Sequence, residues 1–376
     1  MEGRKHITVL IPYSVFPAKM GGQKGIALFY QYFGRLTSLN LITPSPSDMP
    51  NGYPATIFPI LGKGVRRYLN PFHFANIKRV LKKTSSNTVI IEHPYLGWLG
   101  FFLKKFTDVK LVVHSHNIES IRFKSTGRWW WGLLWHYERF THRLADFSFF
   151  VTKEDMDFAI RHFKLSPGKC AVITYGFERN NAPSQNERSK ATAIIRQRHN
   201  IPDSVPIYFF NGTLHYGPNL DALDYVINEI NPRLLKRDQD YRIIICGKGL
   251  PESYRNLSAY SNRNIVFAGF VDDIETYFLG SDIFLNPLTD GGGIKTKLVE
   301  ALGYNMTAVS TKSGATGVPI AVTGGKLKIA EDKDWETFVK LLISSKNQNN
   351  IPEEFFNHFY WGNIAKEAER VLSNKL

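Results

Sequence analysis

The chain has 376 residues and a formal net charge of +14, from 47 Lys and Arg against 33 Asp and Glu. Hydrophobic residues make up 43% of it and aromatic residues 14%, which excludes a disordered or collagen-like chain and, at this length, favours two well-packed domains. Its two cysteines, Cys170 and Cys246, exclude a disulfide framework and a metal site made only of cysteines.

Apolar runs alternate with helical patterns through the first half of the chain. The first run is followed by a loop rich in Gly and Pro, and residues 26–36 then have the pattern of a helix, as do residues 154–163. The strand candidates are residues 7–11, 87–91, 110–114, 147–151 and 171–174. Strands that alternate with helices predict a parallel, doubly wound sheet.

The same alternation starts again after a polar stretch at residues 178–189, which we interpret as a linker. Helical patterns cover residues 219–235 and 361–372. The strand candidates of this half are residues 206–211, 242–246, 264–268, 283–286 and 308–311. The sequence therefore predicts an α/β fold with two Rossmann-like, doubly wound domains facing a central cleft, where open α/β sheets bind their ligands.

The segment with the most specific chemistry covers residues 285–317, LNPLTDGGGIKTKLVEALGYNMTAVSTKSGATG. After a strand, Gly291–Gly293 open a helix that carries Lys295, Lys297 and Glu300. Glycines let backbone N–H groups approach a ligand, the start of a helix attracts anions, and a carboxylate can bind a vicinal diol such as a ribose. The pattern predicts a cradle for a phosphate or diphosphate. The alternative is a surface helix with ordinary lysines.

Two further loops occupy matching positions in the two halves. Residues 17–25, PAKMGGQKG, lack the GxGxxG spacing of dinucleotide-binding loops, but at this position the loop can approach a phosphate or a sugar. In residues 210–219, FNGTLHYGPN, Gly212 follows a strand. For His215 and Tyr216, contact with a ligand and a plain strand–helix connection are equally favoured.

Two histidines lie in the segment HSHNIE, residues 114–119, at the end of a strand candidate. Because the carboxyl end of such a strand faces the cleft, we expect His116 to hydrogen-bond a sugar hydroxyl near the reacting carbon. A structural role is the main alternative. A metal site is disfavoured because the sequence shows no third and fourth ligand of fitting pattern.

The net positive charge of the chain comes entirely from its first half. Residues 1–180 contain 25 Lys and Arg against 11 Asp and Glu, and the remainder is neutral. Residues 63–83 and 122–139 combine basic with aromatic side chains. An anionic membrane surface is the favoured partner, because Trp and Tyr prefer the bilayer interface and basic residues prefer anionic headgroups. A core or solvated position is the alternative; nucleic acid is disfavoured because no nucleic-acid module is visible.

Several blocks are similar to one family of enzymes. They are MGGQKG, HSHNIES, NGTLHYGPNLDALDYVINEINP, IIICGKG, NIVFAGFVDD and NPLTDGGGIKTKLVEALGYNMTAVSTKSGATGV, and they are spread over nearly the whole chain. At these blocks the chain resembles the retaining GT-B glycosyltransferases of glycosyltransferase family 4, the glycosyl transferases group 1. The resemblance implies an acceptor domain at residues 1–180, a nucleotide-sugar domain at 190–355, and a final helix at 356–376 that crosses back to the first domain.

One position departs from the family pattern of two glutamates eight residues apart. Glu300 matches the second, but Gly292 stands at the first, as in a subset with a GGG loop followed by basic residues. The resemblance assigns catalytic roles to His116, Lys295 and Glu300. The donor-binding residues that it implies are Gly21, Gly22, Asn211, Gly212, Phe270, Val271, Gly292, Gly293, Ile294 and Lys297.

The implied activity is a retaining hexosyl transfer from a nucleoside-diphosphate sugar, with UDP favoured over GDP, to a glycan or lipid-linked acceptor in cell-surface polysaccharide or glycoconjugate synthesis. No cofactor, no metal and no nucleic-acid partner are expected. The expected location is the cytoplasm, with peripheral attachment to the inner face of the membrane as one option. The alternatives are a GT-B nucleotide-sugar epimerase and a non-catalytic GT-B subunit that binds a partner, which Gly292 would favour.

Overall fold

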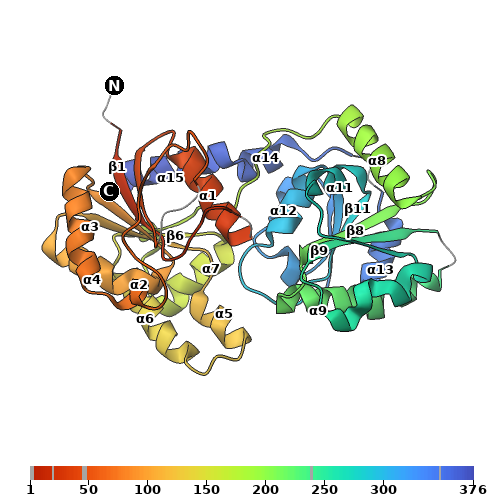
Figure 1. Cartoon of the computed structure of the whole chain (residues 1–376), viewed down its shortest axis with the longest axis horizontal. Coiled ribbons are helices and arrows are strands. Elements are labelled where there is room, and N and C mark those ends of the chain that lie inside the picture. The colour runs from red at the N-terminus through yellow and green to blue at the C-terminus, as the bar shows by residue number, and fades with distance from the viewer. Residues whose placement is uncertain (1–3, 19–20, 45–48, 238–239, 347–348) are drawn as a thin grey trace. The chain divides into compact units, whose positions relative to one another are not determined.

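The computed structural model describes residues 4–18, 21–44, 49–237, 240–346 and 349–376. The chain divides into two compact units (Figure 1). The first unit holds Met1–Gly176, Gly292–Ile294 and Phe359–Leu376, and the second holds Phe177–Gly291 and Lys295–His358. Each unit is built on a parallel sheet, which confirms the predicted α/β fold class. A cleft between the units stays a prediction.

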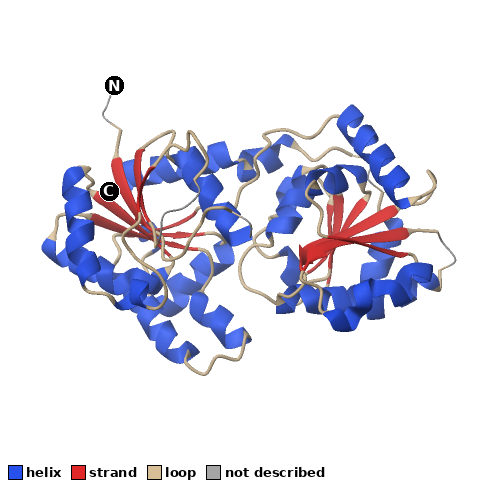
Figure 2. Ribbon diagram, viewed as in Figure 1, coloured by secondary structure: helices blue, strands red, loops and turns tan. Residues whose placement is uncertain are grey.

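Parallel strands form the sheet of the first unit. In the described part of this unit, seven strands pair in the order β3-β2-β1-β4-β5-β6-β7. They are β1 (His6–Leu10), β2 (Ser38–Ile42), β3 (Thr56–Phe58), β4 (Thr88–Glu92), β5 (Lys110–Ser115), β6 (Phe147–Phe150) and β7 (Cys170–Val172). Strands β4 and β6 are buried along their whole length, because helices cover both faces of a parallel sheet, as Figure 2 shows.

Helices connect these strands. They are α1 (Gly21–Phe33), α2 (Arg66–Leu69), α3 (Phe72–Lys83), α4 (Gly97–Phe106), α5 (Glu119–Ser125), α6 (Trp131–Leu144) and α7 (Lys153–Phe158). The core packs Ile91 and Val113 of the sheet against Ile77 of α3 and Leu103 of α4. No helix in the described ranges combines the length and the hydrophobicity needed to cross a membrane.

The last helix of the chain, α15 (Trp361–Lys375), belongs to the first unit and packs on α1. The ring of Trp361 lies 6.3 Å from that of Phe29, and Lys5 Nζ donates a hydrogen bond of 2.8 Å to the carbonyl oxygen of Leu372. A Cβ on Gly176 would lie 2.3 Å from the Trp361 ring, so that only glycine fits there.

The second unit has the same architecture. Its described part contains six parallel strands in the order β10-β9-β8-β11-β12-β13. They are β8 (Ile207–Thr213), β9 (Arg242–Lys248), β10 (Ile265–Gly269), β11 (Ile283–Asn286), β12 (Thr307–Thr311) and β13 (Leu327–Ala330). The helices are α8 (Gln185–His199), α9 (Gly217–Tyr225), α10 (Asn231–Leu235), α11 (Ile274–Gly280), α12 (Thr296–Gly303), α13 (Trp335–Ser344) and α14 (Glu353–Phe359). Its core packs Ile243 and Leu285 of the sheet against Val226 and Phe338.

Three strands were not predicted, namely β2, β3 and β13. Strand β3 has only three residues and lies at the sheet edge. Strand β2 contains Asn40, a residue that is depleted in strands, and the Nδ2 of Asn40 donates to Ser86 Oγ at 3.3 Å. Strand β13 contains Lys328 and has only four residues. Short strands with a polar interruption give too weak a periodic signal.

Two predicted boundaries were wrong. Helix α1 begins at Gly21, so Gly21 and Gly22 lie in its first turn rather than in a loop, and Lys19 and Met20 of that loop are outside the described residues. The linker interpretation fails from residue 185 onward, where α8 begins. There Ser184 and Glu187 form a capping box, in which the Ser184 N–H donates to Glu187 Oε2 at 2.7 Å and the Glu187 N–H to Ser184 Oγ at 3.2 Å.

Candidate active site

Polar side chains gather in the first unit where the neighbouring strands β4 and β5 end. The register pairs Glu92 with His114, and His93 and His116 directly follow the two strands. Because the carboxyl ends of parallel strands meet at one edge of a sheet, these four residues form a cluster there. The edge is the one at which open α/β folds bind ligands.

Glu92 joins two histidines of this cluster and has no exposed side-chain surface. It accepts hydrogen bonds from His114 Nδ1 at 2.9 Å and from His116 Nε2 at 2.6 Å, and the Tyr30 hydroxyl of α1 also donates to it. Burial by itself would raise the pKa of Glu92, but the charges and hydrogen bonds of the two histidines hold it well below its ordinary value. Glu92 is therefore a carboxylate, and it fixes the Nε2–H of His116.

His116 keeps 19% of its side chain exposed, against 4% for His114. Since the Nε2 of His116 faces Glu92, its Nδ1 is the atom that can meet a substrate hydroxyl. His114 lies inside β5, and its Nε2 is buried with no hydrogen-bond partner among the described residues. This geometry suits the expected substrate contact of His116, which stays a prediction.

Sequence reasoning missed Glu92 and His93. The strand candidate of residues 87–91 stops directly before them. His93 has φ 60° and ψ 163°, a backbone region that costs a residue other than glycine about 1–3 kcal/mol. Its ring stacks on that of His116 at 4.7 Å between centroids. The available signal was a carboxylate followed by a histidine at the carboxyl end of a strand.

Glu92, His114 and His116 also offer three potential metal ligands within 4.8 Å of one another. The expectation that the two histidines lack a third ligand is therefore wrong. The third comes from the neighbouring strand, 22 residues earlier in the chain. Two imidazoles and a carboxylate suit a divalent transition metal. In this structure, however, the carboxylate already accepts hydrogen bonds from both histidines and from Tyr30, and a metal would have to break them.

The glycine segment follows β11 and leads into α12; Gly291 and Lys295 belong to the second unit, and Gly292–Ile294 are assigned to the first. Gly291 and Gly293 have φ values of 98° and 67°, which L side chains rarely adopt. Lys295 is the N-cap of α12, and its Nζ donates to the Gly291 carbonyl oxygen at 2.5 Å. A cation at this end opposes the helix macrodipole, and an anion bound there would be stabilised by both the cation and the helix.

Lys297 and Glu300, which were predicted to bind diphosphate and ribose, are paired with each other. Lys297 Nζ lies 2.8 Å from Glu300 Oε2, one turn further along α12. The Glu300 side chain is 8% exposed and that of Lys297 is 37% exposed. The carboxylate is thus held by a charged partner rather than by hydrocarbon, and a bound diol would share it with Lys297.

Asn211 and Gly212 lie inside β8, which runs to Thr213, so the prediction that Gly212 follows the strand is wrong by two residues. The Oδ1 of Asn211 is buried and has no hydrogen-bond partner within the described residues. A Cβ on Gly212 would lie 3.0 Å from the side chain of Asn219, so a larger residue at this position of β8 would require that side chain to shift.

Phe270 and Val271 follow β10, at the same edge of the sheet as the end of β8. The Phe270 side chain is 67% exposed, which is unusual for a large ring. Gly269 before it has φ 67° and turns the chain at the strand end. An exposed ring at this edge is suited to stacking on a flat ligand such as a nucleobase.

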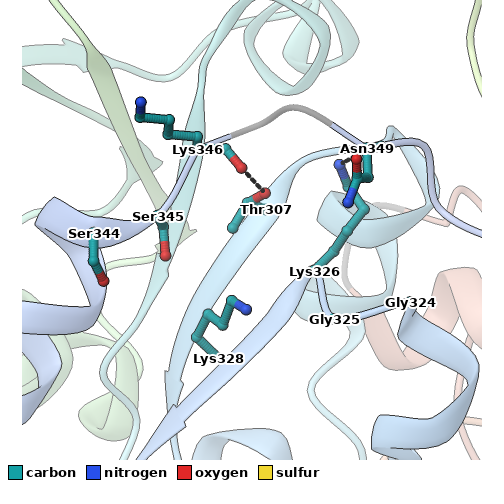
Figure 3. A pocket seen from close by; sticks show the side chains of 9 residues that line it. All are labelled: Thr307, Gly324, Gly325, Lys326, Lys328, Ser344, Ser345, Lys346 and Asn349. Atoms are coloured by element: carbon teal, nitrogen blue, oxygen red, sulfur yellow. Dashed lines mark hydrogen bonds between the residues drawn. The ribbon is translucent and has the colours of Figure 1, made fainter.

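A pocket of about 200 Å³ lies at the opposite, amino-terminal end of β12 and β13 (Figure 3). Its lining includes Lys326, Lys328 and Lys346, near the end of α13. Lysines beside the carboxyl end of a helix are expected from the macrodipole, and Lys326 Nζ donates to the Asn349 carbonyl oxygen at 2.5 Å. The pocket contains none of the predicted site residues.

Two family models match the chain. Glycosyltransferase Family 4 matches residues 35–180, and glycosyl transferases group 1 matches residues 205–345. A relative described as an uncharacterized 44.6 kDa protein in the cps region of Klebsiella pneumoniae is 29% identical over 172 residues, which are 44% of this chain and 44% of the relative. The aligned region therefore spans less than half of that relative.

Several solved structures share the fold over the whole chain. Sucrose-phosphate synthase from Thermosynechococcus elongatus matches with a TM-score of 0.75 at 13% identity, covering 99% of both chains. Anabaena HepE in complex with UDP matches with a TM-score of 0.71 at 14% identity, and the match covers 98% of this chain and 100% of the HepE chain. The lipopolysaccharide outer core galactosyltransferase WaaB matches with 0.66 at 13%, covering 98% and 99%. At these identities the likeness establishes the fold.

The two parallel sheets and these structural matches establish the GT-B fold, and the two family models identify the chain as a glycosyltransferase. The chain belongs to glycosyltransferase family 4, the glycosyl transferases group 1, whose two models match the first and the second half of the sequence. It is therefore a transferase. Membership of the GGG-loop subset stays a prediction.

Proposed function

We propose that the protein transfers a sugar from a nucleoside-diphosphate sugar, with UDP favoured over GDP, to a glycan or lipid-linked acceptor, with retention of the anomeric configuration. The observation that carries this proposal is the start of α12, where a glycine segment with positive φ values meets Lys295 and Lys297 after a parallel strand. The match to a protein solved with UDP supports the choice of nucleotide, and the match to a lipopolysaccharide galactosyltransferase supports the acceptor class.

In the proposed reaction, the bond between the sugar's anomeric carbon and the diphosphate oxygen breaks, and the acceptor oxygen bonds to that carbon. The acceptor proton leaves with the diphosphate. Lys295, Lys297 and the N–H groups of Gly292, Gly293 and Ile294 stabilise the negative charge that grows on the leaving group. Because these groups are fixed before the reaction, little reorganisation is needed as charge develops.

The remaining predicted residues bind the donor in this proposal. Glu300 accepts hydrogen bonds from the ribose diol, and His116 binds a donor-sugar hydroxyl through Nδ1. Asn211 and Gly212 line the donor site at the end of β8. Gly21 and Gly22 present the first N–H groups of α1 to the diphosphate or the sugar. The proposed reaction uses neither a metal nor a cofactor.

The test is a thermal-shift screen against UDP, GDP and their sugar conjugates, followed by assays of sugar-nucleotide turnover. Ligand binding raises apparent stability, so we expect UDP and at least one UDP-sugar to raise Tm. Slow UDP release from that donor would then report transfer to water. Conversion of the donor into an isomeric sugar nucleotide without UDP release would instead identify an epimerase.

Replacing Phe270 by Ala is expected to weaken UDP binding by about 5- to 10-fold, because a ring–base contact contributes roughly 1 kcal/mol. Isothermal titration calorimetry with UDP measures the change. Phe270→Tyr keeps the ring and should bind UDP as the native protein does. Equal losses in the two variants would contradict stacking on this ring.

We also assign the expected membrane contact to the first unit, whose exposed apolar side chains lie among basic residues. Leu69, Phe72, Trp129 and Leu133 are 71%, 75%, 84% and 69% exposed. Helices α2 and α6 are linked through Trp98, whose Nε1 donates to the Tyr68 carbonyl oxygen at 2.6 Å and whose N–H donates to the Tyr137 hydroxyl at 3.0 Å. The large exposed rings favour a bilayer interface, and the surrounding cations favour anionic headgroups.

Sedimentation with anionic vesicles that contain phosphatidylglycerol, and with neutral vesicles of phosphatidylcholine, tests this assignment. We expect the protein to bind only the anionic vesicles, and its affinity for them to fall as the salt concentration rises. In the double variant Trp129→Ser, Leu133→Ser the affinity should be at least about 10-fold weaker, because interfacial rings and nearby cations act together. Ile194→Ser, which changes an exposed side chain in the second unit, is the control. Binding that ignores lipid charge and salt would contradict the assignment.

A further inference from the structure

The first unit contains a further histidine–carboxylate pair, separate from the two pairs that Glu92 forms with His114 and His116. His93 Nδ1 lies 3.0 Å from Glu119 Oε1, and His93 Nε2 lies 2.9 Å from the hydroxyl of Tyr13. Tyr13, His93 and Glu119 thus form a continuous chain of hydrogen bonds. Glu119 ends the segment HSHNIE, but no role has been proposed above for any of these three residues.

Glu119 is the fixed, charged end of this chain. Its side chain is 1% exposed, and it also accepts hydrogen bonds from the Tyr95 hydroxyl at 2.6 Å and from Arg122 Nε at 2.9 Å. Burial by itself would raise the pKa of Glu119, but the hydrogen bond and charge of His93 and the charge of Arg122 lower it to about 2. Glu119 is therefore a carboxylate, and in the neutral form of His93 it fixes the single ring proton on Nδ1.

This tautomer determines the orientation of the tyrosine hydroxyl. With a proton on Nδ1, the Nε2 of His93 is an acceptor, so Tyr13 donates its O–H to His93. Burial, followed by the charges of Glu92 and Glu119, raises the pKa of Tyr13 far above its ordinary value, so that the hydroxyl stays protonated. The lone pairs of the Tyr13 oxygen then remain to accept a hydrogen bond from a second hydroxyl.

The position of the chain of hydrogen bonds within the fold indicates what that second hydroxyl belongs to. Tyr13 lies in the loop after β1, His93 follows β4, and Glu119 begins α5 after β5; these three strands are neighbours in the sheet. Tyr13 is half-buried, and among the described residues its oxygen has no hydrogen-bond partner other than His93. The ring of His93 stacks on His116, which places the Tyr13–His93–Glu119 chain beside the proposed sugar contact.

We infer that Tyr13, oriented by His93 and Glu119, is a binding residue for the hydroxyl that attacks the donor sugar, and that His93 and Glu119 are its positioning residues. The ligand class is a sugar hydroxyl, or water when no acceptor is present. The inference rests on the proposed transferase function. The unfavourable backbone of His93 fits this role, because strained residues persist where the surrounding structure fixes a functional group.

The first experiment compares the native protein with Tyr13→Phe, using slow hydrolysis of a UDP-sugar, in which water takes the place of the acceptor. We expect kcat to fall about 10-fold, as for one lost hydrogen bond, with the donor KM and the affinity for UDP unchanged. Tyr53→Phe is the matched control, because Tyr53 is a half-buried tyrosine of the same unit whose hydroxyl donates to the Ala27 carbonyl oxygen at 2.6 Å. An unchanged kcat in Tyr13→Phe, or an equal loss of UDP affinity, overturns the inference.

The second experiment does not depend on turnover. Long-range ¹⁵N NMR of the native full chain is expected to show neutral His93 protonated on Nδ1, and Glu119→Gln is expected to relax that preference. A neutral His93 protonated on Nε2 overturns the inference even if the protein turns over UDP-sugars. A native protein that binds no sugar nucleotide while His93 keeps the expected tautomer counts against the proposed function instead.

Discussion

Glu300→Gln is expected to lower kcat/KM for the sugar nucleotide by about 10- to 100-fold, because a hydrogen bond to a charged group contributes roughly 1.5–3 kcal/mol. The amide keeps the shape of the side chain but loses the charge that holds Lys297 at 2.8 Å and would hold the ribose diol. Steady-state kinetics and UDP titration measure the loss. We expect both the affinity for the substrate and the stabilisation of the transition state to decrease.

The matched control for this substitution is Glu229→Gln. Glu229 also forms an ion pair with a basic residue of its own helical segment in the second unit, at 2.6 Å from Arg233, but it is 39% exposed and lies outside the proposed site. The Glu229→Gln substitution should leave the kinetics of sugar-nucleotide turnover unchanged. Near-native activity of Glu300→Gln, or an equal loss in both variants, would contradict the role of Glu300.

Glu92→Gln is expected to lower kcat by about 10- to 100-fold with little change in donor KM, because positioning of a catalytic side chain contributes to the transition state more than to binding. A glutamine has only one oxygen, and its N–H₂ group cannot accept a hydrogen bond. It therefore cannot replace both of the Glu92 oxygens that accept from His114 and His116. His116 then loses its fixed orientation. The assay is sugar-nucleotide turnover across pH, alongside thermal unfolding.

Asp146→Asn provides the comparison for Glu92→Gln. Asp146 accepts from Lys104 Nζ at 2.9 Å and from the Leu111 N–H at 2.8 Å, at the amino-terminal end of the same sheet. The Asp146→Asn substitution should lower Tm without changing the shape of the pH profile of sugar-nucleotide turnover. If Glu92→Gln reduces activity only in proportion to the protein that unfolds, its effect is structural.

The fold was largely predictable because its signals are periodic and local. Buried strands such as β4 and β11 each contain a run of three apolar residues, and the glycine segment stands out against them. The short strand β3 and the start of α1 at Gly21 were not predicted, because three residues give no periodicity and two glycines are typical of a loop. The register of Glu92 with His114 is set by strand pairing, which no local pattern encodes.

The candidate site was predicted unevenly for the same reason. Lys295, Lys297 and Glu300 lie at one helix start that the sequence pattern indicated, while their roles are implied by the family resemblance and stay predictions. Their partners could not be predicted from the sequence. Only the folded structure pairs Lys297 with Glu300 and Lys295 with the Gly291 carbonyl oxygen. The roles of Glu92 and His93 depend on partners more than 20 residues away in the chain, so only the folded sheet brings them together.

A crystal structure of the protein with UDP tests the central claim most directly. The account predicts the diphosphate against the N–H groups that begin α12, within reach of Lys295, and the ribose hydroxyls within hydrogen-bond distance of Glu300. UDP bound elsewhere, for example in the lysine-lined pocket at the amino-terminal end of β12 and β13, with Lys297 and Glu300 paired as before, would contradict it.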